Sequence, residues 1–348
     1  MLLLTRRDLQ FRATRFAVVT LGVAVVMTLL FLMTGLIEQF NAEPYLTVDA
    51  IDADQWVLPE GVSGAFTASS TLSPDTAAAV EGPDAAEAVV ARGSLNAEGR
   101  ESDEVLVIGH VIGGLGSPEP TDGRPVEARG EVVLDRSAGF EIGDEVALAA
   151  LPLTVVGLTD DTTLLAGLPV VFVSVEDART GLFDGRPVVS TVLLSGDPDV
   201  LPEGTQVLPA DDIAEDALGP LENAVRSVDI IRILLWVVAA IIIGAVVYLS
   251  ALERARDFAV LKAIGATNRD LVLSIGVQAV LIALGAVGLA AILQGLIEPV
   301  FPLTVRVPGS AFWQIPIVSV VVALLAGLGG MRRVAGSDPA AAFAGPGA

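Results

Sequence analysis

The chain has 348 residues, of which 53% are hydrophobic, yet it carries a formal net charge of -22. It contains no cysteine, which excludes disulfides and thiolate chemistry, and its single histidine, His110, excludes a multi-histidine zinc site. Its single lysine, Lys262, is followed by Ala263, whereas a P-loop needs Lys before Ser or Thr. The chain therefore has no Walker-type nucleotide site of its own.

Acidic and apolar residues occupy different parts of the chain. Of the 42 acidic residues, 35 lie between Phe40 and Asp229, together with only eight of the 20 basic residues. The rest of the chain consists largely of long apolar runs. This separation predicts a solvated acidic domain over residues 40–229 and a remainder that lies largely in a bilayer.

Four apolar runs are long enough to suggest membrane spans. The first, Phe16–Ile37, has about the 20 residues that a membrane helix needs, and it exceeds the apolar core of a cleaved signal peptide. No Asp, Glu, Lys or Arg lies in the middle of any run, which argues against a proton-coupled transporter or an ion channel. The predicted spans are residues 16–39, 230–252, 271–297 and 313–331.

The basic residues near the span ends predict the orientation of the chain. With four spans, the three basic clusters, in the N-terminal tail, between the second and third spans and in the C-terminal tail, fall on one side of the membrane, which is then the cytoplasmic side of a prokaryotic plasma membrane. On that side we expect an amphipathic tail over residues 1–15, the segment 253–270 and the tail 332–348; residues 40–229 and the short loop 298–312 lie outside. The basic residues of these three clusters are Arg6, Arg7, Arg12, Arg15, Arg254, Arg256, Lys262, Arg269, Arg332 and Arg333.

Residues 40–229 alternate short apolar runs with turn signals, which predicts a mixed α+β domain. Helices are expected over Ser73–Val80, where Ser73 and Pro74 provide a cap and a first-turn proline, over Val175–Thr180, and as a stalk over 211–229. The predicted strands are Tyr45–Val48, Ala88–Ala91, Val105–Ile108, Glu131–Leu134, Glu145–Ala149, Leu153–Gly157, Val170–Val175 and Val188–Leu194.

Paired carboxylates recur in this domain, and each pair could be half of a catalytic couple or of a Ca²⁺ site. Acidic residues are scattered throughout the domain without EF-hand spacing, so we interpret the pairs as a solvated acidic surface. We expect no catalytic residue, metal site or bound cofactor in this chain. The pairs are Asp103–Glu104, Asp144–Glu145, Asp160–Asp161 and Asp211–Asp212.

Between the second and third runs, Phe258, Leu261 and Ile264 recur at helical spacing with charged residues on the other faces. Gly265 then suits the end of a helix. This pattern predicts a short amphipathic helix, and by itself it favours a loop that rests on anionic lipid over a docking element.

Small residues recur at helical spacing in the third run, a pattern that allows close helix packing in lipid. Gln278 is the most polar residue inside the run and is expected to form a hydrogen bond between helices. The spacing leaves open whether the face serves packing within the chain or a homodimer seam. The small residues are Gly276, Ala279, Ala283, Ala286 and Ala290.

The run from Arg256 to Ala266 resembles the signature of the FtsX/MacB-type permeases, the type VII ABC transmembrane subunits, with Asp257 where Glu is commoner. The stretch Gln278–Leu281 and the tail Arg332-Arg333 followed by Asp338-Pro339-Ala340 are similar to further family motifs. In the outer domain, Ile142–Val146 with Thr154–Gly157 resembles the periplasmic core pattern.

The resemblance implies a non-catalytic permease that pairs with a second copy of itself and with two copies of a separate ATPase, which holds the ATP and Mg²⁺. ATP hydrolysis would then move the outer domain to export or extract a lipid, peptide or other amphiphile. Alternatively, the protein is a non-transporting regulator of an extracytoplasmic hydrolase or sensor. Membrane lipids are expected neighbours, an outer partner protein is possible, and nucleic acid is not expected. The residues expected to couple to the ATPase are Arg254, Arg256, Asp257, Phe258, Leu261, Lys262, Ile264 and Gly265.

Overall fold

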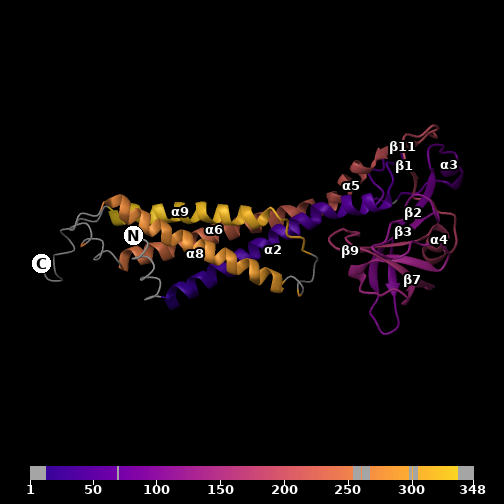
Figure 1. The fold of residues 1–348 in the computed structure, drawn as a ribbon. Coiled ribbons are helices and arrows are strands. Elements are labelled where there is room, and N and C mark those ends of the chain that lie inside the picture. Colours follow the sequence, from indigo (N-terminus) through magenta and orange to yellow (C-terminus); the bar gives the residue numbers. More distant parts are fainter. Residues whose placement is uncertain are drawn as a thin grey trace. The chain divides into compact units, whose positions relative to one another are not determined.

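The computed structural model describes residues 13–68, 70–253, 260, 267–297, 300 and 305–335. They form two compact units. The first, called the helical unit below, comprises the described parts of residues 1–38 and 226–348. The second is Gln39–Val225 and is called the outer unit, after the outer domain that the sequence predicts. Figure 1 shows that the first unit is built from helices and the second around a sheet.

The helical unit contains the first part of α2 (Ala13–Ile51), most of α6 (Glu222–Glu253), α8 (Asn268–Ile297) and α9 (Ala311–Ala335). Among the described residues, three helical segments are long and apolar enough to cross a membrane: Ala17–Ile51, Ala210–Leu249 and Gly276–Ile297. The apolar stretch of α9 is shorter, Ala311–Leu325. Four apolar helices are thus present where the sequence predicts spans.

The helices pack through one continuous apolar core. Met27 of α2, Ile243 of α6 and Ile315 of α9 are buried together with the alanines of α8. Phe31 meets Phe312 at 5.3 Å between ring centroids. Because lipid is as apolar as these side chains, close van der Waals packing rather than the hydrophobic effect holds such a bundle together.

Helix α2 continues beyond the predicted span, and the strand predicted over Tyr45–Val48 is wrong. The sequence Tyr-Leu-Thr-Val has strand propensity, but extending a helix that has already formed is easier than starting a new element. Val48 and Ile51 are buried in the core of the outer unit, which stabilises the added turns. The helix stops where Asp52 adopts a left-handed conformation, with φ of 55°.

The predicted stalk over 211–229 is not one helix. It consists of α5 (Ala210–Leu218), a 3₁₀ turn, η2 (Gly219–Leu221), and the start of α6 at Glu222. Pro220 has no N–H to donate to an earlier carbonyl, so the α-helical hydrogen-bond pattern is interrupted there.

The outer unit contains an 11-stranded mixed sheet with the order β11-β1-β10-β2-β3-β9-β5-β7-β4, to which β6 and β8 attach at the side. β3 runs parallel to β9, and β5 parallel to β7; the other pairs are antiparallel. The strands are β1 Gln55–Pro59, β2 Ala86–Asn96, β3 Asp103–His110, β4 Asp122–Gly123, β5 Glu131–Asp135, β6 Glu145–Leu148, β7 Leu151–Thr159, β8 Thr163–Leu164, β9 Leu168–Ser174, β10 Thr191–Leu194 and β11 Thr205–Pro209.

Both faces of the central strands are buried, which explains why β3 and β9 are continuous apolar runs rather than alternating ones. Val170 and Phe172 of β9 face a core that includes residues of α2 and α5, whereas Val171 and Val173 face the core that α4 (Val175–Phe183) covers. The short helix α3 (Pro74–Ala78) begins as predicted, with the Ser73 hydroxyl accepting a hydrogen bond from the Thr76 N–H at 3.0 Å.

Phe172→Ala tests this assignment of the core. Phe172 is fully buried, so we expect the free energy of unfolding of the outer unit to fall by about 3–5 kcal/mol. Ile142→Ala is the control; Ile142 is 49% exposed, and we expect a change within about 0.5 kcal/mol. Urea unfolding of the full-length chain in detergent, followed by Trp56 fluorescence in a Trp236→Phe, Trp313→Phe background, measures both. Equal effects of the two substitutions would contradict the assignment.

Candidate functional site

The predicted ATPase-coupling segment lies between the end of α6 at Glu253 and the start of α8 at Asn268. Arg254, Arg256, Asp257, Phe258, Leu261, Lys262, Ile264 and Gly265 all fall outside the described residues. Their role therefore stays a prediction from the sequence. Val260, within the same segment, is helical and half exposed.

The small-residue face of α8 lies inside the bundle. Ala279, Ala283, Ala286 and Ala290 have no exposed surface, and Gln278 is only 3% exposed. These alanines therefore pack against other helices of the same chain. A homodimer seam on this face stays a prediction without a contact to support it.

The contacts of this face identify the neighbouring helices. The Thr28 hydroxyl of α2 donates to the Ala24 carbonyl at 2.9 Å and lies 3.5 Å from the carbonyl oxygen of Ala290 in α8. A Cβ added at Gly276 would be 3.6 Å from Leu324 Cδ2 of α9. Small side chains on α8 thus let the backbones of α2 and α9 approach closely.

The chain crosses from one unit to the other at two points, and both points lie inside helices. The unit boundary falls between Glu38 and Gln39 within α2, and between Val225 and Arg226 within α6. The connections are therefore continuous helices, which are stiffer than loops.

Two residues at this junction were missed by sequence reasoning. Glu43 and Thr47 lie on α2, one helical turn apart, and both are buried against the hairpin of β8 and β9. The signal that could have found them is the polar spacing of Gln39, Glu43 and Thr47 at intervals of four, which is helical.

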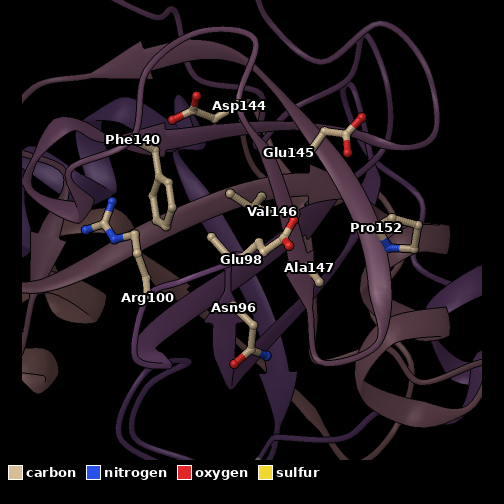
Figure 2. Close-up of a pocket in the computed structure, with 10 residues that line it drawn as sticks. Asn96, Glu98, Arg100, Phe140, Asp144, Glu145, Val146, Ala147 and Pro152 are labelled. Atoms are coloured by element: carbon tan, nitrogen blue, oxygen red, sulfur yellow. The ribbon is translucent and has the colours of Figure 1, made fainter.

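A hollow of about 560 Å³ lies on the outer unit beside β6, and Figure 2 shows the residues that line it. The Arg100 guanidinium lies 4.3 Å from the centre of the Phe140 ring and donates to the Gly139 carbonyl at 2.7 Å. In Figure 2 the carboxylates of Glu98, Asp144 and Glu145 point in different directions and do not converge.

A smaller cleft of about 150 Å³ lies between the end of α2 and the start of α5, and Asp49, Asp52, Asp54 and Asp211 line it. Within the described part of the chain, no group of three or more His, Asp or Glu side chains has a geometry that could hold a metal ion. The four carboxylates are exposed to solvent.

An ion pair on the outer unit joins Glu131 to Arg124. Glu131 accepts hydrogen bonds from the Arg124 guanidinium, with the closer contact at 2.5 Å, and from the backbone N–H groups of Glu127 and Ala128. These donors, the guanidinium above all, lower the pKa of Glu131 to about 2. The carboxylate thereby closes the turn that precedes β5.

Ala286→Leu tests the packing of α8. The larger side chain has no room in the bundle core, so we expect a loss of about 1–3 kcal/mol and a lower melting temperature in detergent. The matched control is Ala245→Leu on an exposed position of α6, which we expect to be tolerated. If Ala245→Leu destabilised the chain and Ala286→Leu did not, the assigned interior of the bundle would be wrong.

The Glu131 carboxylate predicts a pH dependence of stability. Because folding lowers its pKa from the ordinary 4.5 to about 2, its stabilisation is complete above pH 4.5 and is lost as the pH falls toward 2. We expect the melting temperature of the wild type to drop more steeply over that interval than that of Glu131→Gln. Parallel pH profiles of the two proteins would show that Glu131 contributes nothing.

Comparison with known proteins agrees with the two-part architecture. Residues 16–207 match the MacB-like periplasmic core domain, and residues 230–339 match the FtsX-like permease C-terminal domain. Two uncharacterised ABC transporter permeases of Mycobacterium tuberculosis are 37% and 36% identical over 350 residues, covering 99% of this chain and all of theirs.

Among solved structures, the periplasmic region of MacB from Actinobacillus actinomycetemcomitans is 14% identical, with a TM-score of 0.32 over 48% of this chain and 93% of that one. The extracellular domain of the noncanonic ABC-type transporter YknZ from Gram-positive bacteria is 13% identical, with a TM-score of 0.30 over 45% of this chain and 98% of that one. The family domains and the full-length relatives confirm the resemblance in the sequence: the chain belongs to the ABC transporter permeases of the FtsX/MacB type.

Proposed function

We propose that this permease converts ATP hydrolysis by a separate ATPase into movement of its outer domain, and that the movement exports or extracts a lipid, peptide or other amphiphile. Two copies of the permease and two of the ATPase form the working complex, and ATP and Mg²⁺ bind to the ATPase. The complex lies in a prokaryotic plasma membrane with both permease termini in the cytoplasm.

The observation that carries this proposal is the continuity of α2. It is one helix of 39 residues, and at 1.5 Å per residue it is roughly 58 Å long. About 30 Å suffices to cross the hydrocarbon core of a bilayer, so the helix also reaches well into the outer domain. A stiff element of this length can carry a displacement from the cytoplasmic side to the outer sheet.

The sequence supports an external source of energy. The only lysine, Lys262, is followed by Ala263, so a P-loop is absent from the chain. The apolar runs carry no ionisable residue in their interiors, so the side chains that a proton or ion relay across the membrane would need are missing there. Force supplied by a partner accounts for both features.

The outer domain favours transport over the alternative, a regulator that activates an extracytoplasmic hydrolase or sensor. Gln39–Val225 is a large unit with an 11-stranded sheet, and residues 16–207 match a MacB-like core. The two hypotheses share the coupling segment and differ in the outer partner. Accumulation of an amphiphile after deletion supports transport, whereas recovery of a hydrolase with the outer domain supports regulation.

Phe258→Asp tests the coupling segment. Phe258 is expected to lie on the apolar face that contacts the ATPase, and a carboxylate there would have to be desolvated. We expect the affinity for the ATPase to fall about 30-fold or more, the loss typical of an anchor residue in an interface. Phe258→Leu, which keeps the face apolar, is the matched control.

The measurement is co-purification of the separate ATPase with the full-length chain, together with the ATPase rate of the complex in nanodiscs. Association and coupled activity that survive Phe258→Asp would contradict the proposed docking face.

A further inference from the structure

A ladder of buried polar side chains runs along α2 where the helix enters the outer domain. Gln39, Glu43 and Thr47 follow one another at intervals of four residues and therefore share one face of the helix. Their exposed fractions are 1%, 1% and 0%. Burying a polar group costs free energy unless the group forms hydrogen bonds. The hydrogen-bond partners of these three side chains therefore indicate what this face of α2 binds.

Glu43 is held by the turn between β8 and β9. Its Oε2 atom accepts hydrogen bonds from the backbone N–H groups of Ala166 at 3.1 Å and Gly167 at 3.3 Å. Its Oε1 atom accepts one from Nε2 of Gln39 at 3.2 Å. The carboxyl group is thus fixed on one side by its own helix and on the other by the hairpin turn.

Thr47 adds a second contact one helical turn further along. Its hydroxyl donates to the carbonyl oxygen of Thr163 in β8 at 2.9 Å. One contact would fix a point of the helix, but two contacts separated by a turn also resist its rotation and sliding. The hairpin therefore determines both the position and the rotation of this part of α2.

The turn that binds Glu43 has an unusual backbone. Leu165, Ala166 and Gly167 have φ values of 54°, 72° and 95°, so three consecutive residues are left-handed and two of them carry a Cβ. Such conformations are unfavourable for Leu and Ala and persist where the surroundings hold them. Successive N–H groups in such a turn converge to form an anion-binding nest, and here the Glu43 carboxyl group occupies it.

The same part of α2 contains a proline. Pro44 lies between Glu43 and Thr47 inside the helix, and its missing N–H removes one backbone hydrogen bond. A helix under load bends most readily at such a position. The two contacts therefore hold the helix to the hairpin at the turn where its own backbone is weakest.

The hairpin leads directly into the centre of the sheet. β9 follows the turn after Gly167 and pairs with β3 on one side and with β5 on the other. Its Phe172 side chain is fully buried in the core that α2 and α5 also contact. A displacement of the turn is consequently a displacement of a central strand rather than of a surface loop.

We propose that Glu43 and Thr47 form a rigid joint that locks α2 to the β8–β9 hairpin, and that motion of α2 enters the outer sheet through this joint. The joint is a property of the permease alone. Its part in transmission rests on the proposed function, so the two are tested in separate steps.

The first step tests the joint without the ATPase. Hydrogen exchange of the full-length chain in nanodiscs is compared for the wild type, Glu43→Ala and Glu43→Gln. Loss of the carboxyl acceptor frees the amides of Ala166 and Gly167, so we expect exchange across 163–169 to accelerate about 10- to 100-fold in Glu43→Ala. Glu43→Gln keeps one acceptor oxygen and should lie between the two.

The matched control for this step is Glu38→Ala, an exposed position on the same helix. We expect it to leave the exchange of 163–169 unchanged. If the hairpin exchanged equally in the wild type and Glu43→Ala, or if Glu38→Ala had the same effect as Glu43→Ala, the joint would be disproved.

The second step adds the ATPase and compares the nucleotide-free with the ATP-trapped complex. The wild type should show an ATP-dependent change in the exchange of β9, and Glu43→Ala should lose that change while the ATPase still binds and hydrolyses ATP. The same ATP-dependent change in both proteins would refute transmission through the joint. No change in the wild type would refute the proposed function instead, whatever the first step has shown.

Discussion

The hydrocarbon core of a bilayer offers no water to a peptide group, so a chain that crosses it must satisfy its N–H and C=O groups within each segment. Here the solution is a set of helices, and the rest of the structure depends on how far one of them continues. α2 does not end with its apolar run near Ile37; it ends at Ile51, inside the core of the outer domain. One helix thus contains both the apolar run and residues of the core of the outer domain.

The outer domain contacts this helix through hydrogen bonds as well as through apolar packing. Val48 and Ile51 supply the buried apolar surface, and the hydrogen bonds of Glu43 and Thr47 fix the position of the helix along it. Apolar contacts tolerate sliding because they are non-directional, whereas hydrogen bonds lose their energy within a small displacement. The combination suits a joint that must be strong and also defined in register.

Much of the fold could be predicted from the sequence because its causes are local. The long apolar runs predict the membrane helices, and the buried runs at Val105–Ile108 and Val170–Val175 coincide with β3 and β9. The strand predicted at Tyr45–Val48 failed because local propensity was outweighed by a helix already formed upstream. The stalk prediction failed at Pro220, where a single missing N–H changes the helix type.

The contact between Glu43 and the β8–β9 turn was harder to predict, because the residues that form it lie far apart in the sequence. Glu43 and Ala166 are 123 positions apart. No local sequence pattern predicts that the Glu43 carboxyl group contacts a turn of left-handed residues. The alanines of α8 illustrate a second limit. Their spacing predicts a packing face, but only the arrangement of the helices reveals that the face lies inside the chain.

The central claim is that ATP binding to a partner moves the outer domain relative to the membrane segment. Because the chain has no cysteine, spin labels at Ala17→Cys and Glu98→Cys are unique, and both positions are exposed. Double electron–electron resonance on reconstituted complexes, with labelled chains diluted by unlabelled ones, measures the distance between the two labels. The account predicts different distance distributions in the nucleotide-free and ATP-trapped states. Identical distributions in a complex that binds and hydrolyses ATP would contradict it.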